Sequence, residues 1–125
     1  MDSLGQVFEA VSNYFALLSE PVRLRILHSI CREEKSVSQI VAETGATQTN
    51  VSRHLNTLYR AGALSRRKDG NFIYYGVRDS ALTEICRTVC THIAGRTETQ
   101  SGEHSEMRRL AEEWDARPES REELR

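Results

Sequence analysis

Apolar residues recur along this chain with the spacing of amphipathic helices. The first such stripe spans residues 4–18 and consists of Leu4, Val7, Phe8, Val11, Phe15 and Leu18, at i, i+3, i+4 and i+7 spacing. This spacing places side chains on one face of an α-helix. Ser19 and Pro21 then predict the start of a second helix, with Ser19 as its N-cap, which ends near Cys31.

Two short helices follow, and a glycine separates them. The first helix is predicted over residues 36–44 and ends at Gly45. The second helix is predicted to begin after Thr47, which caps it, and to run to about Ala61. Their inward-facing positions are Val37, Ile40 and Val41 in the first helix and Val51, Leu55 and Leu58 in the second. Two short helices joined by a tight turn form a helix-turn-helix.

Residues 64–68 and 72–77 predict a β-hairpin, because an Asp-Gly-Asn turn separates two strand-like runs. A hairpin that directly follows a helix-turn-helix makes a winged helix. A further helix is predicted over residues 80–94. The fold class is therefore mainly α with a small β-hairpin, a winged helix-turn-helix.

The composition changes at Gly95, and this change predicts the domain organisation. Residues 95–105 are polar and rich in Gly, Thr and Ser, which is typical of a flexible linker. One short amphipathic helix is predicted after it, with Met107, Leu110, Ala111 and Trp114 on its apolar face. We expect a winged-helix domain over residues 1–94 and a polar linker with a charged tail over residues 95–125.

The net charge of the chain is −1, but it is unevenly distributed. Residues 46–78 carry a net charge of +5, and residues 95–125 carry one of −3. A basic segment of this kind is typical of a phosphate-binding surface. No apolar run approaches the ~20 residues of a membrane-spanning helix, and the first residues lack the pattern of a secretory signal. We therefore expect a cytoplasmic protein with no membrane partner.

The second helix of the predicted helix-turn-helix is polar at its N-terminal end, where such helices meet base edges in the major groove. Gln and Asn pair with adenine, Arg pairs with guanine, and basic side chains of a wing bind phosphates. The predicted contacts with double-stranded promoter DNA are Thr47, Gln48, Thr49, Asn50, Ser52, Arg53 and His54 on the helix, and Arg66, Arg67, Lys68 and Asn71 on the wing.

Residues 18–27, 48–55 and 72–75 resemble the ArsR/SmtB family of bacterial repressors. The resemblance covers about residues 4–94 and assigns DNA binding and dimerisation to residues 1–94. It implies a homodimer that represses a promoter and releases it on sensing a metal or a thiol-reactive signal.

The apolar stripes agree with a helical dimer interface, because a core of about 90 residues would struggle to cover both the first and the last helix of the winged-helix domain. The predicted interface residues are Val7, Phe8, Val11 and Phe15 on the first helix and Leu82, Ile85, Val89 and Ile93 on the last.

Two sensor sites of that family lack their ligands in this chain. Ser36 and Ser38 stand at the positions of a Cys-x-Cys pair. A second site matches at Asp79 and His92 but has Ala81 and Gly95 where the other two zinc ligands belong. We therefore expect neither of these two sites to bind a metal ion.

Three cysteines remain as candidate sensors. Cys86 and Cys90 are at i and i+4, so their Cβ atoms lie about 5–6 Å apart on one helix face, and Cys31 ends the second helix, where it can approach them. Three thiolates suit a soft trigonal site for a metal or metalloid ion such as arsenite, with Cys86 and Cys90 as the expected metal ligands. Neighbouring thiols also suit an oxidant or a reactive sulfur species. As a third alternative, all three are small buried core residues.

The chain carries no phosphate loop, nucleophile elbow or metalloprotease helix, and we expect that it is not an enzyme. The leading interpretation is a transcriptional repressor that releases its operator when its thiols react with an oxidant or a reactive sulfur species. The alternatives are a repressor that responds to a metal or metalloid ion, a repressor without cysteine sensing, and a winged-helix protein-interaction module. No cofactor other than such an ion is expected.

Overall fold

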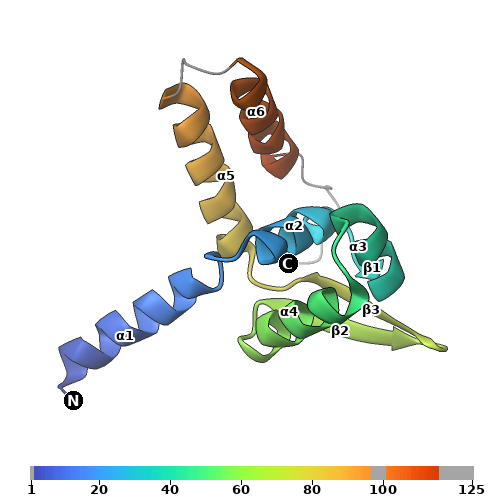
Figure 1. Ribbon diagram of the computed structural model, residues 1–125. Coiled ribbons are helices and arrows are strands. Elements are labelled where there is room, and N and C mark those ends of the chain that lie inside the picture. Colours follow the sequence, from blue (N-terminus) through green and yellow to red (C-terminus); the bar gives the residue numbers. More distant parts are fainter. Residues whose placement is uncertain (1, 97–100, 116–125) are drawn as a thin grey trace.

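The computed structural model describes residues 2–96 and 101–115. Its elements are, in order, α1 (Ser3–Ala16), α2 (Pro21–Ile30), β1 (Lys35–Ser36), α3 (Val37–Thr44), α4 (Gln48–Arg60), β2 (Leu64–Asp69), β3 (Phe72–Val77), α5 (Ser80–Arg96) and α6 (Ser101–Asp115). The hairpin of β2 and β3 follows the helix-turn-helix of α3 and α4 and forms a small antiparallel sheet with β1 (Figure 1). The predicted fold class, mainly α with a β-hairpin, is confirmed.

The helix-turn-helix forms because its two helices have well-defined ends. The Ser36 hydroxyl accepts a hydrogen bond from the Gln39 backbone N–H, and the Gln39 side chain accepts one from the Ser36 backbone N–H. Gly45 ends α3 at a φ of 72°, a left-handed conformation that glycine adopts without steric cost. Thr47 then caps α4 by accepting a hydrogen bond from the Asn50 N–H at 3.2 Å.

The N-cap of α2 differs from the prediction. Glu20 precedes the helix, and its carboxylate accepts a hydrogen bond from the Val22 backbone N–H at 3.1 Å. The Ser19 hydroxyl instead donates to the carbonyl of Ala16 at 2.7 Å. Because Pro21 forces the residue before it into the extended conformation that an N-cap needs, the cap falls on Glu20.

The three strands lie in the order β1-β3-β2. The sequence pattern did not predict β1, whose residues Lys35 and Ser36 pair with Tyr75 and Tyr74 of β3. A strand of two residues is too short to show an alternating pattern. β1 lies next to β3 because the tertiary fold brings together residues that are about 40 positions apart in the chain.

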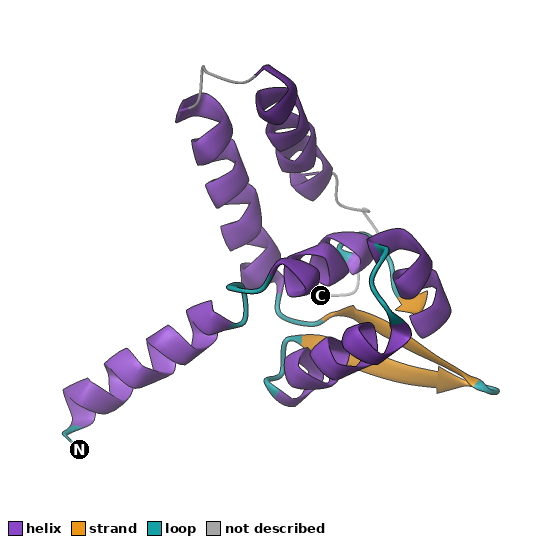
Figure 2. Cartoon of the chain, in the orientation of Figure 1, coloured by secondary structure: helices purple, strands orange, loops and turns teal. Residues whose placement is uncertain are grey.

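The β2–β3 hairpin forms the wing, drawn in orange in Figure 2. Asp69 pairs with Phe72, so the turn consists of Gly70 and Asn71, one residue later than an Asp-Gly turn would begin. Gly70 has a φ of 63°, which a two-residue hairpin turn requires of at least one of its residues.

The core lies between α2, α3, α4 and the sheet. Its fully buried side chains are Ile26, Leu27, Ile30, Ile40, Val51, Leu55, Leu58, Leu64 and Leu82. The inclusion of Leu82 corrects one prediction. We expected this residue at the dimer interface, but its exposed fraction is 0%, so it packs inside its own protomer and has no surface left for a partner.

Helix α1 extends away from the rest of the molecule (Figure 1) and contains no buried residue. The exposed fractions of its apolar side chains range from 46% to 65%, for Leu4, Val7, Phe8, Val11 and Phe15. A short isolated helix of this kind is only marginally stable in water. The apolar stripe of α1 therefore still needs a surface to cover it.

Helices α5 and α6 pack along each other (Figure 1). α5 continues through Gly95 to Arg96, and α6 begins at Ser101. The linker predicted over residues 95–105 is therefore wrong for all of its described residues, which lie in α5 or α6. A glycine costs a helix only about 1 kcal/mol relative to alanine, and helix packing can outweigh that cost.

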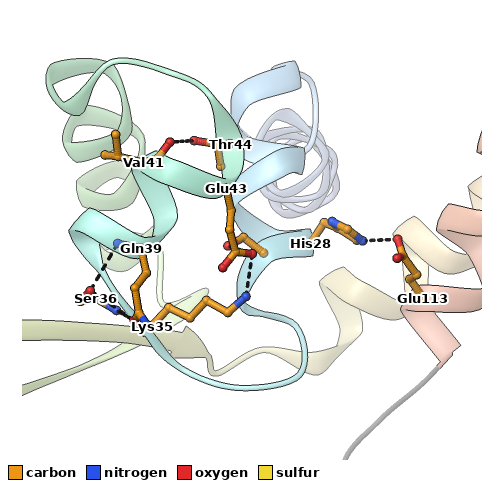
Figure 3. Close-up of polar contacts among 9 residues, drawn as sticks. His28, Lys35, Ser36, Gln39, Val41, Glu43, Thr44 and Glu113 are labelled. Carbon is orange, nitrogen blue, oxygen red and sulfur yellow. Dashed lines mark hydrogen bonds and ion pairs between the residues drawn. The ribbon is translucent and has the colours of Figure 1, made fainter.

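The short helix predicted around Met107–Trp114 lies within α6. The His28 Nε2 of α2 lies 2.8 Å from the Glu113 Oε1 of α6 (Figure 3), and Trp114 is buried in the core. The predicted charged tail beyond residue 115 lies outside the described residues, and the division into two domains stays a prediction. Within residues 2–96 and 101–115, no helix has both the length and the apolar character to cross a membrane.

Candidate DNA-binding surface and cysteine cluster

The N-terminal end of α4 presents polar side chains to solvent. Of the predicted contact residues at this end, Thr47, Gln48, Thr49, Ser52 and Arg53 are exposed, and Asn50 is half-buried. The other face of the helix packs on the core through Val51, Leu55 and Leu58. This separation of faces is what a recognition helix needs in order to enter a major groove while it stays attached to its domain.

Arg53 and Asn50 form a hydrogen-bonded pair on this surface. The Arg53 Nη2 donates to the Asn50 Oδ1 at 2.6 Å. The bond holds the guanidinium over the exposed face of α4, one turn from the N-terminus of the helix. An arginine in this position has the paired donors that the O6 and N7 atoms of guanine accept.

His54 does not lie on the exposed face, and its predicted contact with DNA is wrong. Its side chain is 3% exposed, and its Nδ1 lies 3.2 Å from the Nη1 of Arg23. Arg23 also donates to the carbonyls of Leu17 and Ala16 at the end of α1. His54 therefore attaches α4 to the junction of α1 and α2.

The burial of His54 predicts a pH dependence of stability. Burial, with the charges of Arg53 and Arg23, lowers the pKa of His54 below its ordinary value of 6.5. Below about pH 6.5, His54 of the unfolded chain binds a proton, whereas His54 of the folded chain stays neutral until its lower pKa is reached. The contribution of neutral His54 to the free energy of unfolding is therefore complete above about pH 6.5 and is lost as the pH falls below it. In urea unfolding at a series of pH values, we expect His54→Gln to show a smaller loss of stability on acidification than the wild type.

His92→Gln is the matched control, because His92 is exposed on α5. This variant should keep the pH dependence of the wild type. If His54→Gln and His92→Gln respond to acid in the same way, His54 does not control the acid response.

The basic side chains of the wing lie on both faces of β2, as alternation along a strand requires. The Arg66 guanidinium lies 4.1 Å from the ring centroid of Tyr59 on α4. Arg67 pairs with Glu34, with its Nε 2.7 Å from the Glu34 Oε1, and stacks on Tyr74. The remaining predicted wing contacts, Lys68 and Asn71, are exposed. A phosphate that binds Arg67 must therefore compete with Glu34.

The three cysteines lie near one another where α2 meets α5. Cys31 and Cys86 are buried, Cys90 is half-buried, and no disulfide joins these described cysteines. Burial, with smaller contributions from Cys90 and Cys31, raises the pKa of Cys86 to about 12. Burial also raises the pKa of Cys90, although a hydrogen bond with Trp114 acts in the opposite direction. The thiols of Cys86 and Cys90 are therefore protonated at neutral pH.

No group of three His, Cys, Asp or Glu side chains in the described part of the chain is arranged to hold a metal ion. Asp79, at one of the family positions for zinc, has other partners. It accepts hydrogen bonds from the Tyr14 hydroxyl at 2.7 Å and from the Ala81 backbone N–H at 3.1 Å. Burial, followed by the hydrogen bond to Asp79, raises the pKa of Tyr14 to about 12. Asp79 thus joins α1 to the start of α5.

Several known proteins are similar to this chain in sequence. The "Probable mercury resistance operon repressor" of Streptomyces lividans is 32% identical over 77 residues, which cover 62% of each chain. The cadmium resistance transcriptional regulatory protein CadC of Listeria innocua is 34% identical over 77 residues, 61% of this chain and 65% of CadC. This chain therefore spans less than two thirds of either relative. An uncharacterised HTH-type transcriptional regulator of Methanocaldococcus jannaschii is 31% identical over 83 residues, 66% of this chain and 93% of the relative.

Two solved structures share the fold of this chain at about a quarter sequence identity. NolR from Sinorhizobium fredii superposes with a TM-score of 0.68 at 25% identity, over 73% of this chain and 91% of NolR. Rv0081 from Mycobacterium tuberculosis superposes with a TM-score of 0.65 at 26% identity, over 77% of this chain and 97% of Rv0081.

The fold, the exposed end of α4 and these relatives define the class of protein as a winged helix-turn-helix transcriptional regulator. The family model of bacterial regulatory proteins of the arsR family matches residues 20–65, from the cap of α2 into β2. The chain belongs to this ArsR family, as its resemblance predicted. Because the relatives are transcriptional regulators, the prediction that the chain is not an enzyme is also confirmed.

Proposed function

We propose that this chain is a homodimeric repressor that binds promoter DNA in the cytoplasm. The observation that carries the proposal is the separation of faces on α4, whose exposed polar end is followed by a basic wing. Gln48, Thr49, Asn50 and Arg53 contact base edges. The exposed donors of the wing, Lys68 among them, contact phosphates.

The proposed dimer forms through α1 and α5. Val7, Phe8, Val11 and Phe15 of α1 and Val89 of α5 are exposed, and Ile85 and Ile93 are half-buried. A two-fold axis pairs the same patch on both protomers, so it covers each apolar stripe. It also allows the two copies of α4 to enter successive major grooves, about 34–36 Å apart.

The proposed signal acts at Cys86 and Cys90, on the same helix as the dimer contacts. Binding of a soft metal or metalloid ion is the favoured chemistry, because such an ion displaces thiol protons, and because relatives are named for mercury and cadmium resistance. Binding requires the thiols, including Cys31, to move closer together than in the free protein. Reaction with an oxidant or a reactive sulfur species is the alternative. It is less favoured because oxidants react with the thiolate, and the raised pKa values of Cys86 and Cys90 keep the thiolate fraction low.

The first test selects binding sites from a pool of random duplexes and measures the affinity of the selected duplex as the salt concentration rises. A repressor should recover one duplex sequence, and its affinity should fall steeply with salt, because bound phosphates release counterions. A protein-interaction module recovers no sequence, and that outcome contradicts the proposal.

The second test adds arsenite, zinc, tetrasulfide or peroxide to the complex of protein and DNA. We expect arsenite or zinc to release wild-type protein, and Cys86→Ser and Cys90→Ser to stay bound. Release by tetrasulfide or peroxide alone selects the alternative chemistry. If the variants respond as the wild type does, the cysteines are core residues and not the sensor.

The raised pKa of Cys86 predicts slow alkylation. At neutral pH, iodoacetamide should modify Cys86 about a thousandfold more slowly in the folded protein than in the urea-unfolded chain, because each pKa unit changes the thiolate fraction about tenfold. Mass spectrometry of tryptic peptides over time measures both rates. Similar rates in the folded and unfolded chains would show that the thiol is an accessible, reactive group, and would restore oxidation as the favoured chemistry.

A further inference from the structure

A pocket of about 340 Å³ lies where the end of α1 meets α2, α5 and α6. Its wall includes Leu18, Leu24, Cys86, Cys90, Leu110 and Trp114. The lining side chains are apolar or sulfur-bearing except for Arg25 and His28. The volume falls in the range of small-molecule sites, about 300–1,000 Å³, which are also mostly apolar.

The polar groups at this pocket already have protein partners. The Arg25 Nη1 donates to the Thr44 carbonyl at 3.0 Å, and the His28 Nε2 lies 2.8 Å from the Glu113 Oε1. The Trp114 indole is hydrogen-bonded to Cys90. A charged ligand would lose its hydration here and gain little in return, so the pocket favours an uncharged molecule.

Helix α6 gives the pocket one of its walls. Leu110 and Trp114 come from α6, which the His28–Glu113 pair holds against α2. Figure 3 shows Glu113 reaching from α6 toward His28. The residues that match the family model end at residue 65, so this wall lies outside the matched segment.

We propose that the pocket between α1, α2, α5 and α6 binds a small, uncharged, mainly apolar molecule such as an aromatic hydrocarbon. Binding needs neither thiol chemistry nor contact with DNA. The pocket nevertheless shares Cys86 and Cys90 with the proposed sensor, and Phe15, Ile85 and Val89 with the proposed dimer interface. Leu110 and Trp114 supply apolar contact from α6, Leu24 supplies it from α2, and Cys86 supplies it from α5.

The test uses N-phenyl-1-naphthylamine, an uncharged aromatic probe that fluoresces in apolar sites and accepts excitation energy from tryptophan. Trp114 is the only tryptophan in the chain and lines the pocket. Titration of the full chain should therefore quench Trp114 emission and give saturable probe fluorescence, with one probe bound per chain. Leu110→Glu should weaken binding by at least about tenfold, because it places a charge in the apolar wall.

Two further variants keep the test decisive. Leu110→Phe retains an apolar side chain but fills part of the pocket, so it should also weaken binding, even if Leu110→Glu fails to fold. Phe72→Ser removes an aromatic side chain that is 57% exposed on the wing, and it should bind the probe as the wild type does.

Several outcomes overturn the proposal. One is binding that does not saturate, and another is unchanged affinity in Leu110→Phe. A third is loss of binding in Phe72→Ser, which would place the probe on exposed surface. Finally, if α1 of a second copy fills the pocket, the probe does not bind the dimer. Titration with the selected DNA duplex on the same samples shows separately whether the proposed function holds.

Discussion

Arg53→Ala is expected to weaken binding to the selected duplex by about 5–150-fold, equivalent to about 1–3 kcal/mol. Arg53 is exposed near the N-terminus of α4 and is held there by Asn50 at 2.6 Å. The variant loses one bidentate contact with a base, so discrimination should relax at a single base pair. Fluorescence anisotropy with a panel of duplexes, each changed at one position, measures both effects.

Arg109→Ala is the matched control, because it removes one exposed arginine from α6. This arginine pairs with Glu106 on the same helix, and α6 lies across the molecule from α4 (Figure 1). The control should keep the base preference of the wild type. If both variants lose the same affinity with no change in preference, only overall charge matters, and the assignment of Arg53 to a base contact is wrong.

Phe8→Ser is expected to give the second large effect, a loss of dimerisation. The side chain of Phe8 is 65% exposed in the protomer, and covering it in a dimer contributes about 1.5–3 kcal/mol per copy. A two-fold interface contains the residue twice, so the dimer dissociation constant should rise by about 100- to 10,000-fold. Sedimentation equilibrium measures this constant.

Phe72→Ser serves as the control for dimerisation, because it also replaces an exposed phenylalanine, on the wing, with serine. It should leave the dimer intact. The protomer should remain folded in both variants, since α1 contributes no buried residue. Far-ultraviolet circular dichroism checks this point. A Phe8→Ser protein that still dimerises as tightly as the wild type would remove α1 from the interface.

Local patterns were enough to predict α4 and its cap. Thr47 caps the helix as predicted, and the inward positions Val51, Leu55 and Leu58 are buried. These features depend on residues within a few positions of one another, so the sequence alone determines them.

The predicted DNA contact of His54 was wrong because it was based on the polarity of histidine and not on the position of the residue along α4. His54 lies three residues after Val51 and four before Leu58, so the helical period places it on the inward face. Its polarity suggested the exposed face. In the structure, the ring is buried and its polar Nδ1 lies 3.2 Å from the Nη1 of Arg23, a residue 31 positions earlier in the chain.

The sequence by itself determined the helices from α1 to α5 and the two strands of the wing, and it showed that a polar recognition helix precedes a basic wing. It did not predict β1 or the full length of α6. Only the tertiary structure decided what covers each apolar face. It buried Leu82 in the protomer, left the stripe of α1 exposed, and folded α6 back so that Trp114 meets Cys90. The physical reason is that periodicity identifies an apolar face from neighbouring residues. Its packing partner can lie far along the chain, as Glu113 does from His28, and no local pattern specifies that distance.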